Sequence, residues 1–145
     1  MIFGILAAVL SGALMSVQGV FNTGLSKDTG MWISAAFVQL TAFIVCMAAW
    51  FVTGRESNFS QILAVDNKYR LLGGVFGAFI TYTVILSIQK LGTAHGIMII
   101  VVSQLIVAWI IELFGWFGSK QIDFSWRSAI GAALAIAGVV IFKWN

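Results

Sequence analysis

The sequence predicts an all-α membrane protein with five transmembrane helices in one domain of 145 residues. Two features of the composition lead to this fold class. Hydrophobic residues make up 61% of the chain, and charged residues only 9%. Soluble domains carry about 25% charged residues. The apolar residues also gather into five stretches near the ~20 residues that a helix needs to cross a bilayer. Helices are expected because lipid leaves each backbone amide to find its partner within its own segment.

The first predicted span, residues 2–25, carries polar residues on one face. Ser11, Gln18 and Asn22 are separated by seven and four residues, so they recur on nearly the same side of a helix. Carboxamides in hydrocarbon need a partner. They either bond to neighbouring helices or line a cavity, and the sequence leaves both open. No Lys or Arg precedes this span, so we expect a retained helix and not a signal peptide.

The second and third spans, residues 31–53 and 71–89, each add one candidate site residue. Gln39 lies on a seam of small residues that favours close helix packing. Tyr82 lies in mid-span, where its hydroxyl needs either a cavity or a neighbouring backbone carbonyl. Trp32 and Trp50 bracket the second span as an aromatic belt. The connection between the two spans, residues 54–70, is either a short amphipathic segment at the interface or a solvated linker.

The fourth span, residues 94–115, holds the most unusual polar residues. Gln104 lies near its middle beside Ser103, and Glu112 lies further along, where both can face one broad groove. A carboxylate in a membrane helix costs a few kcal/mol or more. Glu112 therefore either binds a proton or a cation, or it reaches the headgroups or pairs with Lys120 or Arg127. Coupling to protons is a hypothesis that rests on its position within the membrane.

The fifth span, residues 126–142, is rich in alanine and glycine, which favours tight helix packing and a dimer contact. Trp126 and Trp144 bracket it as a second aromatic belt.

Loop charges give only a weak preference for one orientation. The larger group of basic residues falls on the side of the N-terminus, and the smaller group on the other side. The first group is Arg55, Lys68, Arg70, Lys120 and Arg127, and the second is Lys27, Lys90 and Lys143. The first group favours a cytoplasmic N-terminus. Because the bias is small, the chain could insert both ways, and two antiparallel copies would build a ten-helix, inverted-repeat-like assembly.

Several function classes lack their characteristic motifs. The chain has no nucleophile elbow, zinc-protease motif or P-loop, and it has one histidine and one cysteine, so we expect no enzyme, metal site or cofactor. It has no basic cluster that would track a nucleic acid. The expected partners are the lipid bilayer, a small-molecule substrate and a second copy or a sister chain.

Four stretches of the chain resemble the YdcZ family of the drug/metabolite transporter superfamily. They are SVQGVFNTGL at residues 16–25, AAFVQL at residues 35–40, the run at residues 71–118 that begins LLGGVFGAFITY, and RSAIGAALAIAGVVIF at residues 127–142. The resemblance implies a five-helix half-transporter of the inner membrane that assembles as an antiparallel pair. The family also looks related to the small multidrug resistance exporters, but the glutamate in their first helix has no counterpart here.

The sequence thus predicts a secondary-active exporter of a small polar or cationic metabolite that works by alternating access. A non-transporting membrane subunit and a passive solute channel are the alternatives. The predicted substrate-binding residues are Gln18, Asn22, Gln39, Tyr82, Ser103, Gln104 and Glu112.

Overall fold

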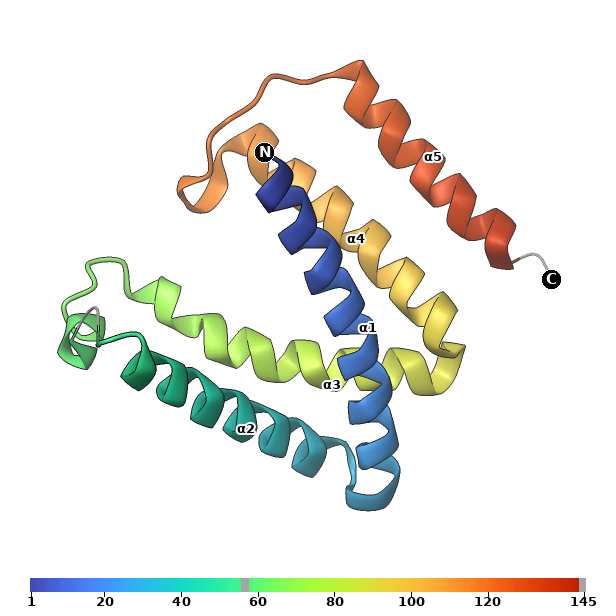
Figure 1. Cartoon of the computed structure of the whole chain (residues 1–145). Helices are drawn as coiled ribbons and strands as arrows, with labels where there is room; N and C mark the ends of the chain where they lie inside the picture. The colour runs from blue at the N-terminus through green and yellow to red at the C-terminus, as the bar shows by residue number, and fades with distance from the viewer. Residues whose placement is uncertain (56–57, 144–145) are drawn as a thin grey trace. The chain divides into compact units, whose positions relative to one another are not determined.

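A computed structural model describes residues 1–55 and 58–143, and it confirms the all-helical class. Five α-helices follow one another along the chain (Figure 1). They are α1 (Ile2–Thr29), α2 (Met31–Val52), α3 (Gly73–Leu91), α4 (Thr93–Phe114) and α5 (Trp126–Lys143). Three short 3₁₀ helices, η1 (Phe59–Ile62), η2 (Lys68–Leu72) and η3 (Trp116–Gly118), lie in the connections. The predicted Trp144 of the second aromatic belt lies outside the described residues.

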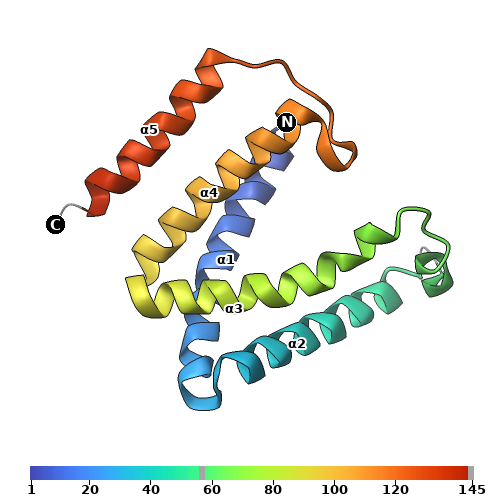
Figure 2. The ribbon, with the colours of Figure 1, turned by 180° about the vertical axis from the view of Figure 1, so that it is seen from behind.

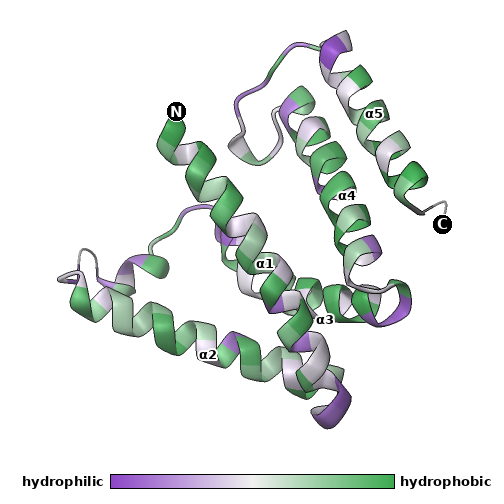
Figure 3. Cartoon of the chain, turned by 45° about the vertical axis from the view of Figure 1, so that its right-hand side comes forward, coloured by the Kyte–Doolittle hydropathy of each residue, from purple (hydrophilic) through white to green (hydrophobic). Residues whose placement is uncertain are grey.

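Four of the five predicted spans are confirmed by length and composition. Among the described residues, four helical segments are long and apolar enough to cross a membrane, whereas the apolar stretch of α5 is shorter. With 18 residues, α5 extends about 27 Å, slightly less than the ~30 Å hydrocarbon core. Hydrophobic residues occupy most of each helix, and hydrophilic residues gather near the helix ends and in the connections (Figure 3).

The chain forms two compact units, Met1–Leu86 and Ser87–Asn145. In the first unit α1 packs against α2, and α2 runs alongside α3 in both views (Figures 1 and 2). In the second unit α4 packs against α5. Among the residues that the structure describes, few apolar side chains are buried. Those are Ala35, Ile85 and Ile88.

Single glycines form two of the connections between helices. Gly30 joins α1 to α2 with φ 87° and ψ 158°, and Gly92 joins α3 to α4 with φ 80° and ψ 164°. This backbone region is accessible essentially to glycine alone. Both glycines close the preceding helix, since each N–H donates to the carbonyl four residues earlier, Ser26 and Ile88. The sharp corners therefore depend on glycine at these two positions.

The predicted end of the first helix is wrong by one turn, because α1 continues from residue 25 to Thr29. Lys27 is among the residues expected in loops, but the hydroxyl-bearing residues around it bond within the helix. Ser26 Oγ donates to the Thr23 carbonyl at 2.8 Å, and Thr29 Oγ1 donates to the Leu25 carbonyl at 2.9 Å. A lysine in the last turn also interacts favourably with the helix dipole. The other helix limits differ from the predicted ones by at most two residues.

Candidate functional site

The predicted site residues divide between the two units. Gln18, Asn22, Gln39 and Tyr82 belong to the first unit, and Ser103, Gln104 and Glu112 belong to the second. Their surroundings differ in kind: most of those in the first unit contact neighbouring helices, and those in the second are exposed along α4.

Asn22 lies inside the contact between α1 and α2 and is only 7% exposed. Across the corner at Gly30, the fully buried Ser34 donates its Oγ hydrogen to the Asn22 backbone carbonyl at 3.1 Å. Gln18, one turn earlier on α1, is exposed. The polar face predicted for the first span therefore begins in the helix contact and continues onto an open surface.

Gln39 joins α2 to α3 through a polar contact. Its Nε2 donates to Thr81 Oγ1 at 3.2 Å, and that hydroxyl donates in turn to the Gly77 carbonyl at 2.9 Å. Gly77 makes room for the carboxamide, because a Cβ at this position would lie 3.2 Å from Gln39 Nε2. The amide nitrogen of Gln39 thus forms a hydrogen bond between two helices. This is one of the two roles, a bond to a neighbouring helix or the lining of a cavity, that the sequence leaves open for carboxamides in a span.

Tyr82 packs its ring on Trp32 at the start of α2. The two rings are stacked with centroids 4.4 Å apart and an interplanar angle of 30°. Phe79, one turn before Tyr82, meets the same tryptophan edge-on at 6.2 Å. Trp32, predicted as part of an aromatic belt, therefore also orients the half-buried Tyr82 ring.

On α4, Ser103 and Gln104 line a shallow groove of about 330 Å³ together with Val107, Ala108 and Ile111. Ser103 is satisfied within its own helix, because Oγ donates to the Ile100 carbonyl at 2.9 Å. Gln104 is exposed. The middle of this apolar helix therefore presents an open carboxamide to its surroundings.

Glu112 lines a larger cavity, of about 540 Å³, between α4 and α5. Trp109 lies one turn before it on the same wall, and Ser128 and Gly131 of α5 lie opposite. Neither cation suggested as a partner for Glu112, Lys120 or Arg127, belongs to the cavity lining. The Trp109 indole Nε1–H is buried and has no hydrogen-bond partner among the described residues. An unpaired buried donor of this kind costs about 1–3 kcal/mol.

The chain that follows α4 contributes Ile122 to the cavity lining. Gly115 ends the helix in the left-handed conformation, with φ 63° and ψ 29°. The chain then folds back, so that the Ile122 N–H donates to the Glu112 carbonyl at 3.1 Å and Gln121 Nε2 donates to the Leu113 carbonyl at 3.1 Å. Glu112 thus lies in the last turn of α4, close to one end of the span.

Sequence reasoning missed the residues that accompany the predicted ones. Trp109 reads as one more apolar residue in an apolar helix, and nothing in the sequence marks its N–H as unpaired. Ser34 likewise carries no signal in the sequence that marks it as the donor to the Asn22 carbonyl. Among the described residues, no group of three histidine, cysteine or acidic side chains is placed to hold a metal ion.

Comparison with known proteins identifies the family. The chain matches the family DMT_YdcZ, described as "Putative inner membrane exporter, YdcZ", over residues 3–141. No curated protein and no solved structure matches the chain. The family match agrees with the apolar helices, and export across a membrane is a non-enzymatic kind of function. Because it spans nearly the whole sequence, the protein is a multi-pass inner membrane transporter that belongs to the YdcZ family.

Proposed function

We propose that the protein exports a small polar or cationic metabolite by alternating access, as an antiparallel pair of chains. The observation that carries this proposal is the exposure of Gln104 in the middle of α4, the most apolar of the candidate spans. A polar group in hydrocarbon costs several kcal/mol of free energy when it has no hydrogen-bond partner. A second protein surface that encloses a polar path for a solute would remove this cost.

The small amount of apolar surface buried within one chain supports an assembly. In the most apolar 18-residue window of α4 no residue is buried, and in those of α1 and α2 only 6% are. Lipid tails can solvate apolar side chains, but they offer no hydrogen-bond partner to the carboxamide of Gln104. A second copy that faces α4 would enclose this residue, and the enclosed space would become the route for the solute.

The antiparallel arrangement is supported by the balance of loop charges. Basic residues flank the spans on both sides of the membrane, so the charge difference that fixes orientation is small. Two oppositely oriented copies would form an inverted pair, the arrangement in which many transporters place a substrate site near the midplane.

Solute counterflow into proteoliposomes tests the transport proposal. Vesicles loaded with candidate polar and cationic metabolites should take up trace labelled solute transiently, with saturation, which a carrier shows and a passive channel does not. Gln104→Leu should reduce this uptake strongly, while Val101→Leu, an apolar exchange at an exposed position of the same helix, should leave it intact. Downhill flux without saturation or counterflow would indicate a channel. Absence of flux for all solutes would favour a non-transporting subunit.

Accessibility of one cysteine tests the orientation proposal. In a Cys46→Ala background, Ser60→Cys would place one thiol in the connection between α2 and α3 without altering the loop charge. A membrane-impermeant maleimide added to intact cells should label about half of the copies if orientation is dual. Complete labelling or no labelling would contradict two opposite orientations of the same chain.

A further inference from the structure

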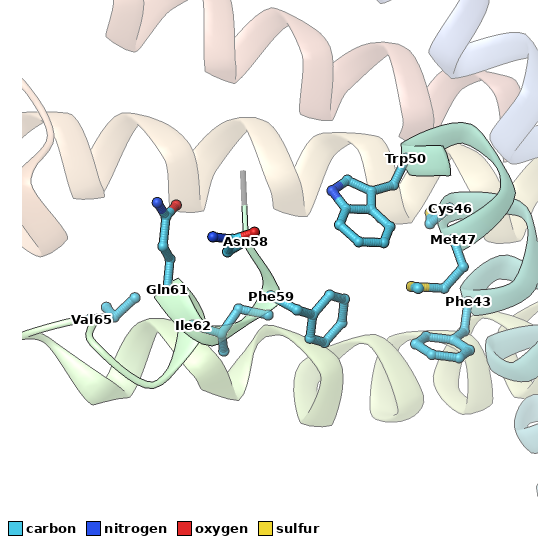
Figure 4. Close-up of a pocket in the computed structure, with 9 residues that line it drawn as sticks. All are labelled: Phe43, Cys46, Met47, Trp50, Asn58, Phe59, Gln61, Ile62 and Val65. Carbon is cyan, nitrogen blue, oxygen red and sulfur yellow. The ribbon is translucent and has the colours of Figure 1, made fainter. Parts of the chain in front are cut away.

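A second cavity lies at the end of α2, and it contains none of the predicted substrate-binding residues. It has a volume of about 430 Å³, within the roughly 300–1,000 Å³ of sites that bind small molecules. Phe43, Met47 and Trp50 form one side from α2, and Phe59 and Ile62 of η1 form the other (Figure 4). We refer to it as the α2–η1 groove.

The groove is apolar along its walls and polar at one end. Trp50 and Phe59 meet across it edge-to-face, with ring centroids 6.2 Å apart and an interplanar angle of 74°. The carboxamides of Asn58 and Gln61 lie on the η1 side, away from Phe43 and Met47 (Figure 4). An elongated molecule with an apolar body and a polar head would match this distribution.

The end of α2 places a cation beside the groove. Gly54 adopts φ 87°, and the Arg55 N–H donates to the Trp50 carbonyl at 3.1 Å, the six-to-one bond of a Schellman cap. The cap fixes the Arg55 backbone near the last turn. Its guanidinium carbon lies 4.8 Å from the Phe51 ring centroid and 5.8 Å from that of Trp50. Trp50 thus forms a wall of the groove, and its ring also contacts the Arg55 guanidinium.

We propose that the α2–η1 groove binds an anionic phospholipid, with an acyl chain along the apolar walls beside Phe43, Met47 and Ile62 and the phosphate on Arg55. Position supports this occupant, because the groove lies where a membrane span ends and headgroups begin. Charge complementarity supports it as well. A guanidinium donates two parallel hydrogen bonds to a phosphate, and amides such as those of Asn58 and Gln61 can donate to ester or headgroup oxygens. A zwitterionic lipid would lack the net charge that Arg55 favours.

The sole cysteine provides a direct reporter for this site. Cys46 lines the groove, and its side chain is exposed. Full-length protein would be reconstituted in nanodiscs of phosphatidylcholine alone or with phosphatidylglycerol, and the rate of maleimide labelling at Cys46 would be measured. Phosphatidylglycerol should slow the labelling several-fold. In Arg55→Asn the ratio of the two rates should fall towards one, with anionic-lipid affinity about tenfold weaker from loss of a charged hydrogen bond.

The controls separate a specific site from general effects. Asparagine tolerates the left-handed conformation that Arg55 adopts, with φ 56°, so the variant should keep the cap. Lys120→Asn makes the same charge change at an exposed lysine of the second unit, and it should keep the wild-type ratio. Counting lipids retained after delipidation, by native mass spectrometry, provides an independent readout.

Three results would overturn the proposal. In the first, Cys46 is labelled equally fast in both lipid compositions. In the second, Lys120→Asn removes the protection by phosphatidylglycerol as completely as Arg55→Asn, which would show that the protection depends only on the net charge of the protein. Protection of Cys46 could also persist without lipid and increase with protein concentration, which would make a second copy the occupant. None of these measurements depends on transport, so the proposed function and the lipid site can fail separately.

Discussion

The corner between α3 and α4 allows a quantitative prediction, because Gly96 packs directly against the end of α3. Gly96 is buried. A Cβ added to it would lie 3.0 Å from Ser87 Oγ, 3.3 Å from the Ser87 carbonyl carbon and 3.4 Å from the Ile88 nitrogen. The first contact could be relieved by a rotation of the serine side chain. The other two involve backbone, so Gly96→Ala should move the two helices apart.

The expected size of the effect is the difference of two terms. Overpacking at a close contact costs about 1–3 kcal/mol. Alanine in a helix returns about 0.5–1 kcal/mol relative to glycine. We therefore expect Gly96→Ala to lower the free energy of unfolding by up to about 2.5 kcal/mol. Adding Ser87→Ala should restore part of this loss, because it removes the nearest atom but leaves the backbone contacts.

A matched control is available on α1. A Cβ at Gly12 would meet no heavy atom within 4 Å, so Gly12→Ala should show only the propensity gain of about 0.5–1 kcal/mol. The assay is reversible unfolding in mixed micelles with increasing dodecyl sulfate, followed by circular dichroism. If Gly96→Ala proved as stable as Gly12→Ala, the close approach of α3 and α4 at this corner would be refuted.

Three further predictions concern other contacts. Gly30→Ala should lower the free energy of unfolding by about 1–3 kcal/mol, since φ 87° with ψ 158° is essentially a glycine conformation; an unchanged unfolding curve would contradict this corner. A double-mutant cycle with Gln39→Leu and Thr81→Val should give a coupling energy of about 0.6 kcal/mol, the average for a hydrogen bond between membrane helices; zero coupling would count against the α2–α3 contact. If Glu112 couples transport to protons, Glu112→Gln should abolish solute uptake driven by a pH gradient and spare counterflow without a gradient. Uptake that persists in Glu112→Gln would exclude that coupling.

The sequence predicted the helices well because hydropathy is a local property. All five appear, and most limits agree closely, since apolar runs end where polar residues and glycines begin. The exception is the end of α1, where Lys27 was expected in a loop. The helix instead continues to Thr29, and Gly30 ends it. Conformation at a corner depends on both helices that meet there, and a window of hydropathy does not contain that information.

Partners of the polar residues were much harder to predict. Gln39 was recognised as unusual, but its bond to Thr81 depends on how α2 and α3 pack at Gly77. The unpaired N–H of Trp109 depends equally on what surrounds it. The residue type shows that a polar side chain in an apolar span needs a hydrogen-bond partner, whereas the packing of the helices determines which residue provides that partner. The sequence therefore identified candidate positions on the helices without their contacts.

Water access to the middle of α4 is the most direct test of the central claim, that its polar residues face a route for a solute. Gln104→Cys in a Cys46→Ala background would be exposed to a membrane-impermeant thiol reagent in proteoliposomes. The comparison is Ile99→Cys, at an exposed position about 140° around the same helix. The cysteine at position 104 should react, and solutes carried by the protein should slow the reaction, while the one at position 99 should stay unreactive. Equal lack of reaction at both positions would contradict the central claim.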